Sequence, residues 1–176
     1  MIIGVVAAKS YSNRFPNKNK FNFEGEPLFW HSVVPLLESK MVDKIYVATD
    51  DYEIKQHCIE RGVSVIWRNS NASDTDDKLI NIIKFVYYSI TEEPEIIVSI
   101  MANCPRHTSD DVERAIQILK TNALREVRSY DNTGVENGIL VLSREVLKKT
   151  NEISCYVGAI STGGKEIHYR EEIENI

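Results

Sequence analysis

Three positively charged side chains, Lys9, Arg14 and Lys18, lie in one short polar segment that follows the apolar run 2–8. The same segment contributes small polar side chains at Ser10, Ser12, Asn13 and Asn19. Phosphate groups bind to such a combination, because cations neutralise their charge while hydroxyl and backbone N–H groups donate hydrogen bonds. The segment lacks the glycine spacing of a P-loop or of a dinucleotide-binding turn. Its composition alone is equally consistent with phosphate binding and with a solvated surface loop.

Nucleophilic and metal chemistry have less support among the cysteines and histidines. Cys58 follows His57 directly, and adjacent residues of a helix point in different directions. Cys104 and His107 are close in the chain, but no third member of a catalytic set accompanies them. No group of residues has the spacing of a zinc site. Together with Cys155, these cysteines lack a CxxC spacing and indicate reduced thiols in a cytoplasmic protein.

The elements that must position these residues follow from the hydrophobic pattern. Residues 2–8 form a continuous apolar run that is typical of a buried parallel strand. Strands are expected at 2–8, 44–49, 63–67 and 95–101, with shorter strand-like pieces at 124–129, 138–142 and 155–160. Helices are expected at 27–40, 52–61, 78–90, 109–121 and 144–149. Strands that alternate with helices indicate βαβ crossovers, and therefore an α/β fold with a mainly parallel, mixed sheet.

Some details of these helices can also be predicted. In the helix at 27–40, Leu28, His31, Val34 and Leu37 lie near one face. The helix at 52–61 follows Asp50-Asp51, whose carboxylates can cap it.

Three polar loops, 9–22, 68–77 and 102–108, follow strands of the predicted sheet. Ligands of open α/β sheets bind beyond the carboxyl ends of the strands. We therefore expect these loops to form one site.

Length and charge restrict the partners. The chain has 176 residues, which fits one domain spanning 1–176, and a formal net charge of −5. An acidic chain argues against nucleic acid bound over a broad basic face. No apolar run is long enough to cross a membrane, and the short apolar start lacks the basic residues of a signal peptide. We predict a cytoplasmic protein without nucleic-acid or membrane partners.

The first loop resembles a signature of the sugar-acid cytidylyltransferases, a family that includes the acylneuraminate and 3-deoxy-manno-octulosonate enzymes. Their first strand is followed by a pattern like A-R-x-x-S-x-R-x-P-x-K-N. The matching residues here are Ala8, Ser12, Arg14, Pro16, Lys18 and Asn19, and Lys9 stands where the family usually has Arg. Similar segments follow in the family's order at 25–28, 47–51, 62–75, 97–111 and 137–138. The resemblance is strong over about residues 1–122.

The resemblance implies a three-layer αβα fold of the Rossmann-like, nucleotide-diphospho-sugar transferase type. It also implies a reaction in which a hydroxyl group of a sugar acid attacks the α-phosphate of CTP. The products are a CMP-sugar and pyrophosphate, and the expected cofactor is Mg²⁺. A homodimer is the family expectation.

Residue roles follow from the same resemblance. Lys9, Arg14 and Lys18 would hold the triphosphate, and Lys9 and Lys18 are the predicted catalytic residues. Asn19 and Arg68 would hold the ribose or base, although Arg68 could instead form a surface ion pair with an aspartate of 74–77. The predicted nucleotide-binding set is Ala8, Lys9, Ser10, Ser12, Asn13, Arg14, Lys18, Asn19, Arg68 and Asn103.

The chain departs from the family pattern at several positions. Met101 stands where the acylneuraminate branch has a cytosine-reading Gln, and Asn103 lies in a loop where the octulosonate branch has a metal-binding Asp. A neutral amide lacks the charge that Mg²⁺ prefers. His107, where Arg is frequent, is expected to be a partly exposed loop residue. His168 and Arg170 align with the two aspartates of the family's late D-x-D motif.

These departures leave the metal ligands open. The remaining candidates are Asp50, Asp74, Asp76, Glu171 and Glu172. The region between 119 and 137 is short, so the sugar site must be smaller, open or completed by another subunit. Two alternatives to the cytidylyltransferase therefore remain: a catalytically silent nucleotide-binding relative, or a relative that uses another nucleoside triphosphate.

Overall fold

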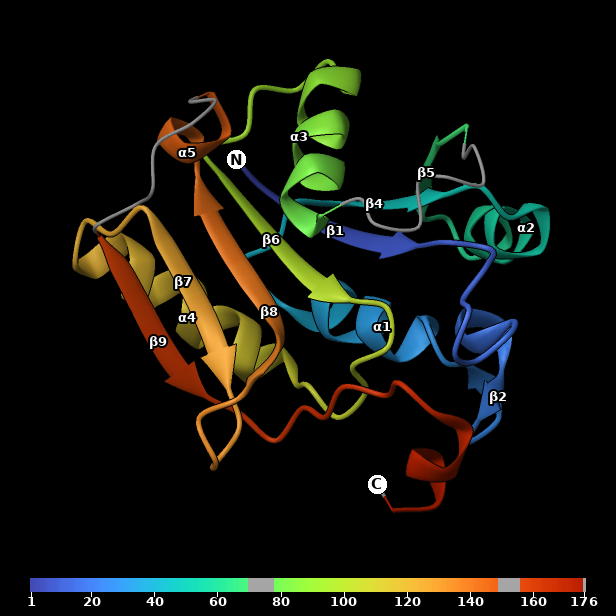
Figure 1. The fold of residues 1–176 in the computed structure, drawn as a ribbon. Coiled ribbons are helices and arrows are strands. Elements are labelled where there is room, and N and C mark those ends of the chain that lie inside the picture. Colours follow the sequence, from blue (N-terminus) through green and yellow to red (C-terminus); the bar gives the residue numbers. More distant parts are fainter. Residues whose placement is uncertain (70–77, 149–155, 176) are drawn as a thin grey trace.

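The computed structural model describes residues 1–69, 78–148 and 156–175. Its centre is a seven-stranded sheet with the strand order β5-β4-β1-β6-β8-β7-β9 (Figure 1). The strands of this sheet are β1 (Ile2–Ala8), β4 (Lys44–Thr49), β5 (Ser64–Trp67), β6 (Ile96–Met101), β7 (Glu126–Tyr130), β8 (Glu136–Ser143) and β9 (Val157–Ser161). The helices are α1 (Trp30–Glu38), α2 (Tyr52–Glu60), α3 (Leu79–Ser89), α4 (Ser109–Thr121) and α5 (Arg144–Lys148). A hairpin of β2 (Asn22–Phe23) and β3 (Glu26–Pro27) and the 3₁₀ helices η1 (Lys18–Lys20) and η3 (Arg170–Asn175) complete the described elements.

The sheet is mixed. β1 pairs in parallel with both β4 and β6, and β4 pairs in parallel with β5. β8 is antiparallel to β6 and β7, while β9 is parallel to β7. The parallel half follows from the helix between each pair of strands, because a parallel connection needs a crossover. The predicted mainly parallel, mixed sheet is confirmed.

Apolar side chains on both faces of the sheet create two cores. Along β1, Ile2, Val6 and Ala8 pack with residues of α1, α2 and α4, whereas Ile3 and Val5 pack with residues of α3 and α5. This alternation is the period of a strand, and it explains why the sequence is apolar at every position. Helices cover both faces, so the three-layer αβα arrangement is confirmed (Figure 1).

The first helix differs from its prediction. α1 begins at Trp30 rather than at Pro27. Phe23 pairs with Glu26 across a turn in which Gly25 has a φ of +93°, a conformation that favours glycine. The N–H of Leu28 then donates to Phe21 O at 2.9 Å, so this stretch extends the hairpin pairing instead of starting the helix.

The buried face of α1 agrees only in part with the row at 28, 31, 34 and 37, because Val34 packs against the core while Leu37 does not. Trp30, Val33 and Leu36 are buried against the sheet, whereas Leu37 is 49% exposed. Packing of Trp30, Val33 and Leu36 in the core cluster sets which side of the helix is buried. Gly4 of β1 makes room for this contact, because a Cβ there would lie 3.1 Å from Leu36 Cδ1.

Other boundaries agree with the sequence to within a few residues. Asp51 caps α2, since its carboxylate accepts from the N–H groups of Glu53 and Ile54 at 2.8 and 3.1 Å. Thr108 and Asp111 form a capping box at the start of α4. The predicted end of the helix at 144–149 and the predicted start of the strand at 155–160 lie outside the described residues. In the part of the chain that the structure describes, no helix has the length and apolar character that crossing a bilayer requires.

The contrast between neighbouring leucines gives a stability test. Leu36→Ala removes a side chain that is fully buried, so we expect the free energy of unfolding to fall by about 2–5 kcal/mol. Leu37→Ala, on the exposed side of the same helix, is expected to change it by less than about 0.5 kcal/mol. Urea unfolding of both variants measures the difference, and equal losses would contradict the observed face of α1.

Candidate functional site

A cavity of about 270 Å³ lies at the carboxyl ends of β1 and β6. Its lining residues are Ala7, Lys9, Arg14, Lys18, Asn19, Arg68, Leu79, Ile82, Met101, Ala102, Asn103, Glu166 and His168. They come from the ends of β1 and β6, from α3, from all three loops predicted to form one site, and from the C-terminal segment, in which the sequence indicated candidate metal ligands alone. Residues 70–77 of the second loop, including Asp74, Asp76 and Asp77, lie outside the described residues.

Positive charge dominates the described lining. Lys9, Arg14, Lys18 and Arg68 face the same cavity, together with a single carboxylate, that of Glu166. In a chain with a net charge of −5, this is a strong local reversal of sign. A concave surface lined by one sign of charge concentrates counter-ions. The cavity is therefore suited to a polyanion.

The backbone of the first loop is held by its own polar side chains. Asn19 is buried and its amide donates to Lys9 O at 2.9 Å, while the Ser10 hydroxyl and N–H donate to Asp50 at 2.9 and 2.6 Å. Phe15 is buried in a small cluster with Phe23, Leu28 and Ile167. These contacts fix the backbone positions from which the side chains of Lys9 and Lys18 extend.

Several predicted nucleotide-binding residues lie outside the cavity lining. Ala8 is fully buried at the end of β1, and Ser10 is engaged with Asp50. Ser12 and Asn13 belong to the same loop but do not line the cavity. Their assignment as nucleotide contacts stays a prediction, whereas Asn19 and Asn103 do line the cavity.

Lys18 is half-buried in the wall of the cavity. Its ammonium group donates to Ile167 O at 2.9 Å. Burial lowers the pKa of Lys18, and the neighbouring charges of Arg14 and Lys9 lower it further, while Glu166 opposes the shift. An anion that enters the cavity would favour the charged form and raise this pKa again.

The tail segment, residues 162–168, completes the cavity. In Figure 1 the chain leaves β9 and crosses to the region of the β2–β3 hairpin. Ile167 is fully buried, its N–H donates to Asn103 O at 2.8 Å, and the Asn103 amide donates to Ile167 O at 2.8 Å. Glu166 and His168, on either side of Ile167, face the cavity.

Sequence reasoning missed Glu166 and His168 as site residues. It aligned the late acidic motif with His168 and Arg170, but the Arg170 guanidinium lies over the Phe21 ring, 5.7 Å from its centroid. The missed signal is the alternation of polar, apolar and polar residues at 166–168. In an extended segment this pattern puts both polar side chains on one side of a buried anchor.

The metal candidates are mostly engaged elsewhere. Asp50 accepts from Ser10, and the Glu172 carboxylate accepts from the N–H groups of His168 and Tyr169. Among residues 1–69, 78–148 and 156–175, no group of three His, Cys, Asp or Glu side chains could hold a metal ion. Glu166 alone supplies one carboxylate to the cavity. One carboxylate fits Mg²⁺ only in the mode where substrate phosphates provide further oxygen ligands.

His107 differs from its expectation. It is 6% exposed rather than partly exposed, because its ring packs beneath the tail segment and its Nε2 lies 2.7 Å from Asn137 O.

Comparison with known proteins decides the family. A family model described as cytidylyltransferase matches residues 3–175. The chain belongs to this cytidylyltransferase family. The match covers nearly the whole chain and agrees with the resemblance found in the first loop.

Curated relatives of this chain are longer proteins. It is 27% identical over 139 residues to the N-acylneuraminate cytidylyltransferase of Streptococcus agalactiae serotype III, covering 78% of this chain and 33% of the relative. It is 31% identical over 117 residues to the 3-deoxy-manno-octulosonate cytidylyltransferase of Bdellovibrio bacteriovorus, covering 66% and 45%. The chain thus spans about a third to a half of the relatives' length.

Solved structures show the same fold at low sequence identity. A CMP:2-keto-3-deoxy-manno-octonic acid synthetase complexed with CTP has a TM-score of 0.82 at 16% identity, covering 99% of this chain and 95% of that one. The 4-diphosphocytidyl-2C-methyl-D-erythritol synthase of Anaerococcus prevotii has a TM-score of 0.71 at 12% identity, covering 99% and 93%. The expected Rossmann-like nucleotidyltransferase fold is confirmed.

The lowered pKa of Lys18 gives a test of the cavity with inorganic tripolyphosphate. We expect affinity to fall as the pH rises through the pKa of Lys18 in the free protein, because binding must then take up a proton. Lys18→Met should weaken binding at pH 7 by about tenfold or more and remove this alkaline fall. Calorimetry in two buffers of different ionisation enthalpy measures both effects.

Lys20→Met is the matched control, because Lys20 belongs to the same 3₁₀ helix but pairs with Asp51 and Glu53 at 3.1 and 2.8 Å. Equal losses in both variants would show that the cavity does not bind the polyanion through Lys18.

Proposed function

We propose that this chain transfers a cytidylyl group from CTP to an acidic sugar. The observation that carries the proposal is the gathering of Lys9, Arg14, Lys18 and Arg68 around one cavity of a cytidylyltransferase chain. A hydroxyl oxygen of the sugar forms a bond to the α-phosphorus, the bond between that phosphorus and the α–β bridging oxygen breaks, and pyrophosphate leaves. The hydroxyl proton passes to solvent. Curated relatives named as cytidylyltransferases for sugar acids support this choice of substrates.

The roles follow from what this transfer requires. Phosphoryl-type transfer depends mainly on positioning and on neutralising charge on the phosphate oxygens. Lys9, Arg14 and Lys18 bind the triphosphate, with Lys9 and Lys18 stabilising charge that develops on the leaving pyrophosphate. Arg68 and Asn19 line the same cavity and contact the nucleoside.

We propose Mg²⁺ as the cofactor, held by Glu166 together with the phosphates of CTP. The ion would neutralise phosphate charge and polarise the reacting phosphate. Among the described residues that line the cavity, Glu166 supplies one carboxylate for the ion. For this reason a catalytically silent nucleotide-binding protein is the second candidate.

A second cavity offers a place for the sugar acid. It has a volume of about 230 Å³ and shares Leu79 and Met101 with the first cavity, so a ligand there lies next to a bound nucleotide. Lys78 and Arg128 supply positive charge, and Glu136 accepts from Arg128 at 2.8 Å. Cations suit the carboxylate of the sugar acid, while Glu136 suits its hydroxyl groups.

The proposed reaction goes with a cytoplasmic location and a homodimeric assembly, which we also propose. Cys58 and Cys104 are buried free thiols, which is compatible with a reducing compartment. The homodimer is the assembly that the family resemblance implies.

Turnover tests the proposed reaction. The protein is mixed with CTP, Mg²⁺ and a panel of nonulosonic and octulosonic acids, and pyrophosphate release is measured. We expect release with at least one acid and a preference for CTP over UTP, ATP and GTP. Nucleotide binding by calorimetry without turnover would favour the silent relative, and preference for another triphosphate would replace CTP.

The predicted catalytic cation gives a second test. Lys9→Met should lower kcat/KM for CTP by about 10²–10³-fold, because it removes charge stabilisation at the phosphates. Lys44→Met is the matched control, since Lys44 pairs with Glu92 at the other end of β4. Unchanged kcat/KM in Lys9→Met would remove Lys9 from the mechanism.

A further inference from the structure

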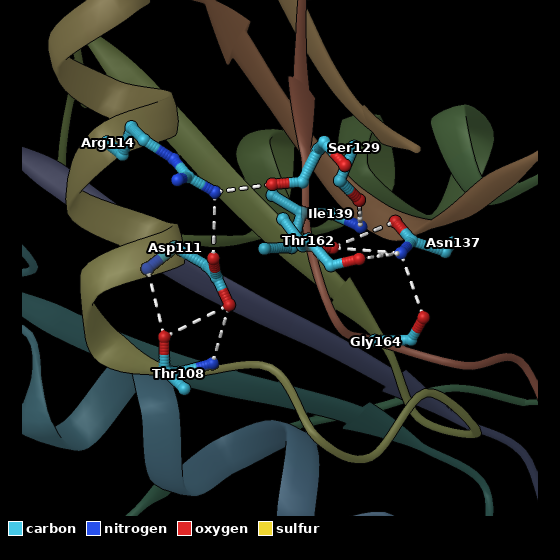
Figure 2. A network of polar contacts seen from close by, with 9 residues as sticks. Thr108, Asp111, Arg114, Ser129, Asn137, Ile139, Thr162 and Gly164 are labelled. Atoms are coloured by element: carbon cyan, nitrogen blue, oxygen red, sulfur yellow. Dashed lines mark hydrogen bonds and ion pairs between the residues drawn. The ribbon is translucent and has the colours of Figure 1, made fainter. Parts of the chain in front are cut away.

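The tail segment is held by a buried amide before it reaches the cavity. Asn137 lies in β8 and is 3% exposed. Its Nδ2 is within hydrogen-bonding distance of three acceptors: Thr162 Oγ1 at 2.8 Å, Thr162 O at 3.2 Å and Gly164 O at 2.8 Å. Figure 2 shows the amide directed at Thr162 and Gly164. An asparagine amide can satisfy such neighbouring carbonyls where an apolar side chain would leave them unpaired.

Close packing restrains the same part of the tail segment. A Cβ built on Gly164 would lie 2.1 Å from Cε1 of the His107 ring, so no side chain fits there. The ring is fixed in turn, because its Nε2 lies 2.7 Å from Asn137 O. Burial lowers the pKa of His107, which keeps the ring neutral with one N–H to donate. The adjacent Gly163 is different, since a Cβ there would meet nothing within 4 Å.

A third contact secures the end of β9. Arg114 of α4 donates to Ser161 O at 2.5 Å. It also donates to Asp111 at 3.0 Å (Figure 2). The chain is therefore held at Ser161 by Arg114, at 162–164 by Asn137 and His107, and at Ile167 by Asn103. Within the tail segment, the residues that line the cavity are Glu166 and His168, on either side of the last of these anchors.

We propose that Asn137 and Gly164 are positioning residues that direct Glu166 and His168 into the cavity. Neither residue lines the cavity itself. Between Gly164 and Ile167 the chain has only two residues in which to reach the cavity, so a displacement at Gly164 is passed to Glu166. The effect on turnover rests on the proposed function, whereas the effect on the tail segment does not.

The glycine pair gives a matched test of the geometry. Gly164→Ala forces the tail segment away from His107, while Gly163→Ala adds the same methyl group in open space. Hydrogen exchange of the 162–169 amides, followed by mass spectrometry, should be faster by about tenfold or more in Gly164→Ala, with exchange in β1 and β6 unchanged. Gly163→Ala should match the original protein. Equal exchange in both variants would overturn the proposal.

Thr162→Val and Asn137→Ala provide variants without added bulk. Thr162→Val removes only the hydroxyl contact to Asn137 and should give a smaller increase than Asn137→Ala, in which both carbonyls lose their donor. If Gly164→Ala fails to fold, Thr162→Val still tests the anchor, and unchanged exchange in both polar variants would contradict it.

A double-mutant cycle separates positioning from a purely structural role. With activity counted per nucleotide-binding site, Gly164→Ala should lower kcat/KM for CTP by about tenfold or more, and this loss should largely disappear in a Glu166→Gln background. Additive losses would mean that Gly164 does not act through Glu166. Faster tail exchange without turnover in any variant, including the unaltered protein, would refute the proposed function and leave the anchoring role intact.

Discussion

The gathering of positive side chains at one cavity is the constraint on which the arrangement depends. Four positive side chains share a space of about 270 Å³ with one carboxylate among the described lining residues. Side chains on flexible supports would move apart into solvent. Here the loop backbone is fixed by Asn19, and the ammonium group of Lys18 is held by a main-chain carbonyl, that of Ile167. The cations are therefore positioned before a polyanion binds, which is how preorganised sites gain affinity.

Most of the fold follows from local sequence signals. β1 is apolar at every position because helices cover both faces of the sheet, and that pattern alone predicts a central parallel strand. The capping residues Asp51 and Thr108 mark the starts of α2 and α4 for a chemical reason, since each accepts from N–H groups that the helix leaves unpaired. The start of α1 could not be predicted in this way. It depends on a two-strand hairpin that is extended where the N–H of Leu28 donates to Phe21 O. Nothing in the sequence at Pro27 indicates that this pairing takes the place of the first helical turn.

The candidate site likewise has residues that local sequence predicts and residues that depend on tertiary contacts. Lys9, Arg14 and Lys18 could be predicted because they follow one strand closely and the end of a parallel strand is a binding position. Glu166 could not, because its position depends on tertiary contacts: the burial of Ile167 and its pairing with Asn103. The spacing of charges in the chain says nothing about a segment that returns to the sheet after leaving its last strand. The roles of Ser12 and Asn13 remain predictions, since neither is among the residues that line the cavity.

The bond between Lys18 and Ile167 joins residues 149 positions apart. Contacts of such separation form late, because the entropy of closing the loop must be met before they contribute. At ribosomal rates of about 5–20 residues per second, roughly 7–30 s separate the synthesis of these two residues. During that interval the amino-terminal half of the sheet can assemble with its cationic loop uncovered by Glu166. A nascent chain therefore passes through a stage in which this loop is open to any cellular polyanion, and the arrival of the tail segment ends it.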